Sequence, residues 1–378
     1  LAGGAWSMLG RPISAPDWVR VRIEQRLAEA VPALDISFGD MRLLVDPDGL
    51  AHVALTDVDI RSDTGAQVAT LSDIEAGFSP SALLRGEVVL RRARLTGAML
   101  ALRRDAHGKL GLALGDVFDS DAPMPDLPTL IGLIDGAFAR PQLAGLRSVE
   151  AEALTIRYED VRAGRGWTAD GGRLSLTRED GALRLAGDVA LLGRGDTAAT
   201  LELNAESRIG ETSADFGMAL EGLDAQDIAT QSPALAWLHG LRAPISGALR
   251  GSMTEDGQLG ALNATLRIGA GVLQPNTRTQ PIPFDLARTY FSYSPGSATL
   301  TFDEISVRSA VGTILADGRA ILREASDGWP RSMTGQFRVS RFEADPEGFL
   351  DRPLALDGAE VDWQLDFEPF RFELGRLR

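Results

Sequence analysis

The chain has 378 residues, of which 44% are hydrophobic and 24% are charged, values typical of a folded globular protein. Its 53 acidic residues outnumber its 38 basic residues, and a net charge of −15 repels nucleic acid, so nucleic-acid partners are excluded. The chain contains no cysteine, which excludes disulfides, thiol nucleophiles and sites with cysteine ligands such as iron–sulfur clusters.

No stretch of 18 apolar residues occurs, so the sequence predicts no membrane span within this chain. The first nine residues are apolar, small and uncharged, and the chain begins with Leu1. Two interpretations stay open for this segment: an irregular end, or the remainder of a transmembrane helix located upstream.

The first expected element is an amphipathic helix over residues 14–31. Ser14 and Asp17 have the spacing of a capping box, and Pro32 ends the helical pattern. Val19, Ile23 and Leu27 repeat every four residues and so share one apolar face. Apolar spacing predicts further helices over 128–139 and 225–239 and a short turn of helix over 79–84.

Most of the remaining chain alternates apolar and polar residues over four to eight positions, which is typical of half-buried strands. Asp-Gly pairs, which favour tight hairpin turns, punctuate these strands at 48–49, 170–171, 180–181, 256–257, 317–318 and 357–358. The pattern therefore predicts a mainly β protein built from long, twisted antiparallel sheets, with a few short helices.

The apolar alternation changes phase near Thr56, because Val53 and Leu55 have odd numbers whereas Val58 and Ile60 have even ones. One extra residue, as in a β-bulge, would restore a single apolar face, and bulges also bend a sheet. Such a face has to be covered by closure of the sheet, by a second sheet, or by a ligand in an open groove. Periodicity alone leaves these alternatives open.

Two proline-rich segments divide the chain. Residues 119–128 are acidic and proline-rich, and residues 274–283 are polar and proline-rich. We therefore expect an N-terminal cap unit over 1–118, a linker with a helix over 119–145, and a repetitive β region over 146–378.

Catalytic motifs are missing from the sequence. It contains no G-x-S-x-G, H-E-x-x-H or phosphate-binding G-x-x-x-x-G-K-[ST] pattern. His52, His107 and His239 lie far apart, with no histidine or cysteine at ligand spacing. Residues 46–49 begin like a calcium loop but lack the later ligands, and the acidic run around Asp119 is interpreted as a solvated loop. We predict no enzyme activity, no cofactor and no metal site.

Several segments resemble one known family. Residues 244–274 read as a Pro-x-Ser-Gly strand, an Asp-Gly turn and a strand that ends in Gly-x-Gly-x-Leu. Residues 149–189 carry a Tyr-Glu-Asp step at Tyr158, an aromatic residue at Trp167 and a paired-strand pattern. With the segments 71–75 and 78–94, this order is similar to that of the AsmA-like superfamily, especially its YhdP-type members with a chorein-like N-terminal cap.

The resemblance implies a function in the Gram-negative envelope. Such proteins are anchored in the inner membrane by an N-terminal transmembrane helix, which this chain lacks, and extend into the periplasm. Their β-sheets form an elongated, open, taco-like groove, implied to pass phospholipid between the inner and outer membranes. The implied partners are phospholipid, the inner membrane and other envelope proteins.

On this interpretation the inward apolar positions of the strands form the floor of a lipid groove. The candidate groove residues are Val53, Leu55, Leu100, Leu102, Leu174, Leu176, Leu183, Leu185, Leu201, Leu203, Leu266, Ile268, Leu300 and Phe302. Val19, Ile23 and Leu27 would cap one end. A charge on the floor, such as Leu203→Asp or Ile268→Asp, is expected to block lipid without unfolding the protein.

Arginines 91, 92, 94, 103 and 104 form a basic cluster along two expected strands. We interpret them as protection for an exposed sheet edge, with contact to lipid phosphates as the alternative. A second function also stays open: a scaffold for outer-membrane protein assembly or envelope integrity that binds partners through its strand edges.

Overall fold

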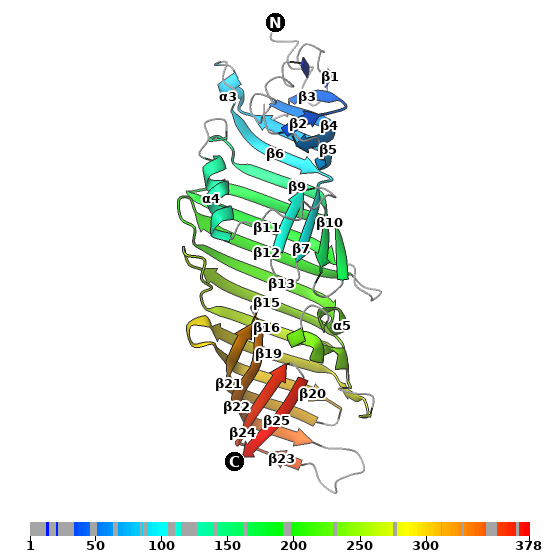
Figure 1. The fold of residues 1–378 in the computed structure, drawn as a ribbon, viewed down its shortest axis with the longest axis vertical. Coiled ribbons are helices and arrows are strands. Elements are labelled where there is room, and N and C mark those ends of the chain that lie inside the picture. Colours follow the sequence, from blue (N-terminus) through cyan, green and yellow to red (C-terminus); the bar gives the residue numbers. More distant parts are fainter. Residues whose placement is uncertain are drawn as a thin grey trace. The chain divides into compact units, whose positions relative to one another are not determined.

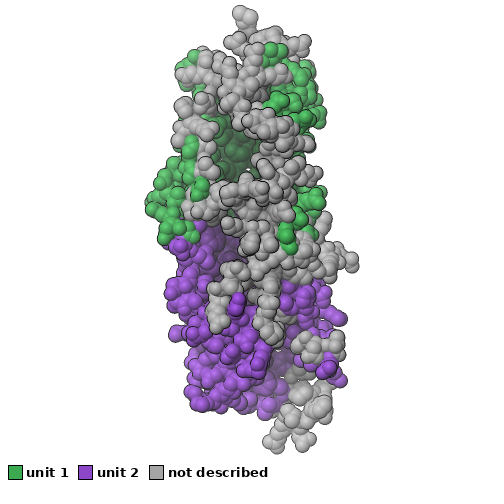
Figure 2. All heavy atoms as spheres, in the orientation of Figure 1, with its two compact units in different colours: residues 1–190, 204–213, 255–257 green, residues 191–203, 214–254, 258–378 purple. Residues whose placement is uncertain are grey.

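A computed structural model provides the structure of the chain (Figure 1). It describes residues 13–14, 20–21, 34–45, 51–62, 67–83, 85, 89–104, 110–114, 127–138, 143–161, 165–191, 198–229, 233–274, 278–310, 312–326, 329–344, 354–367 and 370–378. Two compact units are distinguished (Figure 2): unit 1 comprises residues 1–190, 204–213 and 255–257, and unit 2 comprises residues 191–203, 214–254 and 258–378. The predicted boundaries at 118 and 145 stay a prediction.

The protein is mainly β with a few short helices, and its strands pair almost entirely antiparallel, which confirms the predicted fold class. The parallel pairs among the described strands join β9 (Ser148–Asp160) to β6 (Leu90–Thr96) and to β7 (Met99–Arg104). Among the described helices, none has both the length and the apolar composition needed to cross a bilayer.

The sheet of unit 1 begins with β1 (Ile13–Ser14), β2 (Leu34–Ser37), β3 (Met41–Val45), β4 (Ala51–Ser62) and β5 (Gln67–Phe78). Strand β4 pairs with β2 and β3 along one edge and with β5 along the other. The order continues through β6 and β9 to β10 (Arg165–Glu179), while β7 also pairs with β8 (Leu110–Leu114). Strands β11 (Ala182–Leu191) and β12 (Ala199–Arg208) belong to the same sheet.

A crease crosses the strands of unit 1. Asp57 in β4, Gly97 between β6 and β7, Ala153 in β9 and Gly171 in β10 all have positive φ, from 49° to 75°. Asp57 lies opposite Ser72, because Thr56 pairs with Asp73 and Val58 pairs with Leu71.

At this crease the spacing of inward residues changes from two to three. Leu55 and Val58 therefore point into one core cluster, as do Leu71 and Ile74 on β5 and Leu95 and Ala98 beyond it. The predicted change of phase near Thr56 is confirmed, but the β-bulge proposed for it is wrong, because the register with β5 is unbroken from Thr56 to Val58. Its physical cause is the left-handed residue Asp57.

Helix α4 (Leu127–Phe138), predicted over 128–139, lies across one face of the unit 1 sheet (Figure 1). Its Phe138 is buried in a cluster with Leu146 and Leu183, and half-buried Ala93, Val149 and Leu176 pack around them. The short helix α3 (Pro80–Leu83) agrees with the turn predicted over 79–84.

The sheet of unit 2 runs in the order β13 (Ala214–Asp224), β15 (Pro244–Met253), β16 (Leu262–Ile268), β19 (Leu286–Ser294), β20 (Thr299–Ser309), β21 (Gly312–Ser326), β22 (Trp329–Ala344), β24 (Ala359–Phe367) and β25 (Phe370–Leu377). Strand β23 (Leu354–Leu356) also pairs with β22. Among the described strands no pairing joins β25 back to β13, so this sheet is open.

A helical segment fills part of the apolar face of unit 2. It consists of α5 (Ala225–Ala229) and the 3-10 helix η1 (Pro233–Gly240). Leu238 of η1 is buried with Ile245 of β15, and half-buried Leu266 and Ile268 pack against the same cluster. Because η1 also contacts β22 and β24, the sheet curls far enough for distant strands to share one covering segment. A small sheet of β14 (Leu241–Arg242), β17 (Gly271–Leu273) and β18 (Ile282–Phe284) extends this layer.

Several sequence predictions need correction. The single helix expected over 225–239 is two elements, because Pro233 lacks the amide hydrogen that a continuous helix needs. Ser14, expected to cap a helix, lies in β1 and pairs with Arg42 of β3. Of the helix predicted over 14–31 only Arg20 and Val21 are described beyond Ser14, and both are helical. Ile282 and Pro283, the last residues of the segment interpreted as a linker over 274–283, belong to β18.

The Asp-Gly pairs divide into two groups. Asp180-Gly181, Asp256-Gly257 and Asp357-Gly358 lie between strands, as predicted, and their glycines have φ between 77° and 82°. Asp170-Gly171 and Asp317-Gly318 lie inside β10 and β21, so the turns predicted there are wrong. The pair at 48–49 lies outside the described residues.

Candidate functional site

The apolar face of unit 2 is the candidate functional surface. A cross-strand row of four paired residues, Met218, Leu249, Ala264 and Phe291, crosses β13, β15, β16 and β19 on this face. Met218 is 42% exposed and the other three are half-buried, although all four carry apolar side chains. Apolar surface that stays accessible across neighbouring strands is typical of a binding surface.

An aromatic row continues from Phe291 across the next strands. Its ring centroids lie 5.9 Å apart for Phe291–Phe302, 5.7 Å for Phe302–Phe337, 4.8 Å for Phe337–Trp363 and 6.2 Å for Trp363–Phe372. The row therefore joins five strands, from β19 to β25. Phe372, at its far end, is 50% exposed.

Two glycines make room for these rings. A Cβ added to Gly318 would lie 2.7 Å from the Phe337 ring, and one added to Gly335 would lie 2.7 Å from Cζ2 of Trp363. Trp363 is 5% exposed, and its buried indole nitrogen has no hydrogen-bond partner among the residues that the structure describes. This part of the face is consequently aromatic and, at Trp363, buried.

The structure distributes the predicted groove residues among separate clusters. Val53, Leu55 and Leu174 belong to the cluster at the crease, whereas Leu176 and Leu183 pack with α4. Leu266 and Ile268 pack with α5 and η1, and Leu300 and Phe302 pack with Trp363. Leu185, Leu201 and Leu203 are half-buried and belong to none of these clusters.

The predicted groove positions are thus partly covered by the protein's own helices. Leu100 and Leu102 lie on β7, paired with Leu114 and Leu112, and the placement of their side chains is not described. The predicted cap residues Val19, Ile23 and Leu27 lie outside the described residues.

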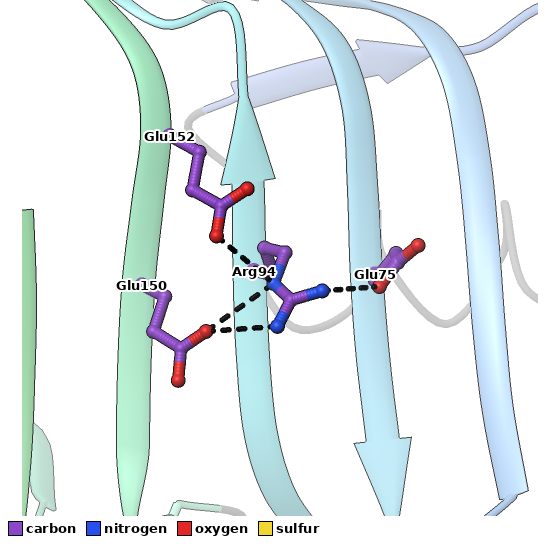
Figure 3. A network of polar contacts seen from close by, with 4 residues as sticks. All are labelled: Glu75, Arg94, Glu150 and Glu152. Carbon is purple, nitrogen blue, oxygen red and sulfur yellow. Dashed lines mark hydrogen bonds and ion pairs between the residues drawn. The ribbon is translucent and has the colours of Figure 1, made fainter. Parts of the chain in front are cut away.

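The opposite face of the unit 1 sheet carries polar side chains, and some of its arginines pair with carboxylates. The clearest case is Arg94, which lies between three glutamates (Figure 3). Its guanidinium donates to Glu150 Oε2 at 3.1 Å and 3.2 Å, and lies 3.6 Å from Glu75 and 3.8 Å from Glu152. The prediction that β6 needs edge protection is wrong, because β6 is internal and pairs with both β5 and β9.

The hydrogen bonds to Glu150 raise the pKa of Arg94 above its ordinary value, and the charges of Glu150, Glu152 and Glu75 act in the same direction. Partial burial opposes the shift. A raised pKa on a cation adds stability that is fully present below its ordinary pKa and disappears only as pH rises through the folded-state value. The stabilisation by Arg94 is therefore constant across neutral pH.

A polar hollow of about 430 Å³ lies on the face of the unit 2 sheet opposite the apolar row. Ser246 and Ala248 form part of its floor, with Arg267, Arg288 and Tyr290 at one end and Glu202 and Glu221 at the other. Arg288 lies 3.5 Å from Glu304 and its guanidinium carbon lies 5.4 Å from the centre of the Tyr290 ring. Its charges of both signs distinguish this hollow from the apolar face.

Sequence reasoning missed the aromatic row, the helices that cover parts of the face, and this hollow. The signal for the aromatic row was present, because Phe291, Phe302, Phe337 and Trp363 occupy inward strand positions. The covering helices had no such signal, since helix amphipathicity does not identify the sheet face that a helix contacts.

Metal chemistry finds no support among the residues that the structure describes, where no three histidine, cysteine, aspartate or glutamate side chains converge as a metal site would require. Asp46, Asp48, Asp119 and His107, considered above from the sequence, lie outside the described residues.

A scan against protein-family models finds no match to this sequence, and searches of curated proteins and of solved structures find none either. The resemblance to the AsmA-like superfamily therefore stays a prediction from sequence motifs.

Proposed function

We propose that this protein is a non-enzymatic lipid carrier that holds the acyl chains of phospholipids on its apolar sheet face. In this proposal it acts in the periplasm and passes phospholipid between the inner and outer membranes, as its resemblance to the AsmA-like superfamily implies. The observation that carries the proposal is the accessible apolar row Met218–Leu249–Ala264–Phe291 on an open sheet.

The chemistry of this row suits an acyl chain. Four adjacent strands span about 14 Å at their usual spacing of roughly 4.8 Å. Each methylene group removed from water contributes about 0.8 kcal/mol, so a chain lying on the row gains affinity without any polar contact. The half-buried Leu201 and Leu203 of β12 offer further apolar positions.

A pair of adjacent substitutions tests the proposal. Ala264 lies on the apolar face, whereas Thr265 follows it on the polar face and is exposed. We expect Ala264→Asp to remove phospholipid that co-purifies with the chain, detected by native mass spectrometry and lipid extraction. Thr265→Asp, which adds the same charge to the opposite face, is expected to retain the lipid.

The alternative outcomes are informative. A wild-type protein without lipid under gentle ionisation would contradict the proposal. Lipid retained by both variants would place the binding surface elsewhere. Thermal unfolding of both variants checks that loss of lipid does not result from loss of the fold.

A second function, scaffolding of envelope proteins, is favoured by strand β25. Among the described strands β25 pairs only with β24, and its Phe372, Leu374 and Leu377 are 50%, 67% and 67% exposed. An open strand edge with exposed apolar side chains can accept a partner strand. Pull-down of envelope proteins by the wild type, but not by a Leu374→Lys variant, would support this function over lipid carriage.

A further inference from the structure

Three arginines form a row at one margin of the apolar face of unit 1. The backbone amide of Arg147 donates to the carbonyl of Arg91 at 2.9 Å, and the amide of Arg178 donates to the carbonyl of Arg147 at 2.7 Å. Neighbouring strands are about 4.8 Å apart, so the three backbones lie within roughly 10 Å.

The strand register places this row beside the apolar face. Val149 pairs with Leu176 and with Ala93, and all three belong to the apolar cluster around α4. Arg147 lies two residues before Val149, and Arg178 lies two residues after Leu176. Alternation along the strands therefore places both arginines on the same face as these apolar residues. Arg91 is the extra residue of a bulge between Leu90 and Arg92.

Contacts of Arg178 agree with this placement. Its guanidinium carbon lies 5.8 Å from the centre of the Phe138 ring, and its Nη1 donates to the carbonyl of Ala144 at 3.2 Å. Phe138 is buried in the same cluster as Leu183, so Arg178 marks the line where the apolar face meets the solvent. Long side chains at such a margin contact apolar groups with their stems and place the charge in water.

The row lacks carboxylate partners. Within the described part of the chain, no carboxylate lies within ion-pair distance of Arg91, Arg147 or Arg178, while the neighbouring Glu179 pairs with Arg184 at 3.4 Å. Ten other arginines lie within 4.0 Å of an acidic side chain, namely arginines 42, 61, 94, 173, 184, 288, 338, 341, 371 and 378. Arg250 and Arg267, like the three arginines of the row, have no carboxylate at this distance among the described residues. Like charges side by side on a sheet are unfavourable, and the row differs from other arginines without an ion pair because its three members lie on hydrogen-bonded neighbouring backbones.

We propose that Arg91, Arg147 and Arg178 bind the phosphate of an anionic amphiphile whose chains contact the adjoining apolar side chains. Guanidinium groups match the geometry of phosphate oxygens, and a bound phosphate would relieve the repulsion within the row. This inference rests on the proposed lipid-carrier function and adds a headgroup site on unit 1, distinct from the apolar row of unit 2.

The test compares two ligands with identical chains. Dihexanoyl phosphatidylglycerol carries a phosphate and dihexanoylglycerol does not, and isothermal titration measures the affinity of each for the full chain. We expect the wild type to bind the phospholipid at least about tenfold more tightly, which corresponds to one net charge-assisted hydrogen bond. Arg147→Gln should remove most of this preference and leave the affinity for dihexanoylglycerol unchanged.

Arg92→Gln is the matched control. Arg92 is exposed, precedes Ala93 and lies on the opposite face of the same strand, so its replacement should keep the headgroup preference. Arg91→Gln/Arg147→Gln is the second variant, since neither side chain makes a hydrogen bond or ion pair within the described residues and the fold should persist.

The outcomes separate this inference from the proposed function. If neither lipid binds the wild type, both fail. If dihexanoylglycerol binds but the phospholipid binds no more tightly, or if the arginine variants keep the preference, only the arginine row is refuted. Binding of inorganic phosphate that disappears in Arg147→Gln, with no binding of either lipid, would identify a site for free phosphate and overturn the amphiphile.

Discussion

Trp363 stacks on Phe337 with the ring centroids 4.8 Å apart and the ring planes at 17°, while its own cross-strand partner is Gly335. The indole thus leans over the glycine toward the neighbouring aromatic position. Because Gly335 has no side chain, the aromatic row passes from β22 to β24 without a break. The aromatic end of the apolar face depends on this relationship.

Gly335→Ala tests the relationship directly. The new Cβ would clash with the backbone oxygen of Arg319 and would lie 2.7 Å from Cζ2 and 2.8 Å from Cε2 of Trp363, so both the paired strand and the indole have to move. We expect a loss of about 1–3 kcal/mol in the free energy of unfolding, together with a change in tryptophan emission. Gly296→Ala is the control, because a Cβ there meets nothing within 4 Å. A loss of stability without a change in tryptophan emission would assign the effect to the Arg319 carbonyl, and equal stability of the two variants would show that neither neighbour needs the space.

The sequence predicted the strands well because alternation is a local property, and it predicted the turn at Asp180-Gly181 for the same reason. Asp170-Gly171 looks identical in sequence but lies inside β10, where the positive φ of Gly171 forms part of the crease. Gly318 is likewise inside β21, where its missing side chain makes room for Phe337. A local pattern cannot distinguish a glycine needed for a turn from one needed for a bend or a close contact.

The candidate site was less predictable than the fold. The inward positions of Leu201 and Leu203 follow from alternation, and the structure places both half-buried on strand β12. Whether an inward position is accessible depends on what covers it, and α4, α5 and η1 come from segments distant in sequence from many residues they cover. The sequence pattern singled out Arg91 with phosphate contact as an alternative, but contained no signal for Arg147 and Arg178, which become its neighbours only through strand pairing.

The crease predicts an unusual response to glycine. Ala153 has φ of 49°, a conformation that costs a residue with a Cβ about 1–2 kcal/mol. We expect Ala153→Gly to raise the free energy of unfolding by about 1 kcal/mol, measured by urea denaturation. Ala151→Gly, two residues earlier in β9, is the control and should lower it by about 0.5–1 kcal/mol. A destabilised Ala153→Gly would mean that the left-handed conformation is not maintained in solution.

A carboxylate at Leu203 and a carboxylate at Ile268, which the sequence analysis treats alike, should affect the stability of the protein differently. Leu203 is half-buried outside the described clusters, so Leu203→Asp is expected to reduce lipid binding with little loss of stability. Ile268 packs against buried Ile245 and the η1 segment, so an unpaired carboxylate there should cost about 1–3 kcal/mol or more. Thermal unfolding with lipid quantification distinguishes the two. A severe loss of stability in Leu203→Asp would indicate that this position belongs to a closed core.

The network around Arg94 predicts a salt-dependent defect. Arg94→Gln leaves Glu75, Glu150 and Glu152 close together without the cation that links them, and we expect a loss of about 1 kcal/mol at low ionic strength. The Debye length is about 3 Å in 1 M salt, so salt screens the repulsion among these part-exposed carboxylates. The difference in free energy of unfolding between Arg94→Gln and the wild type should therefore shrink as sodium chloride is added.

Arg173→Gln is the control for this network. Arg173 is 69% exposed and lies 3.8 Å from a single carboxylate, that of Asp188. Its replacement should change the midpoint of urea unfolding by much less, because one exposed pair contributes little. If the two variants respond alike to salt, the three glutamates do not act together on Arg94, and the network contributes no more than a single surface pair.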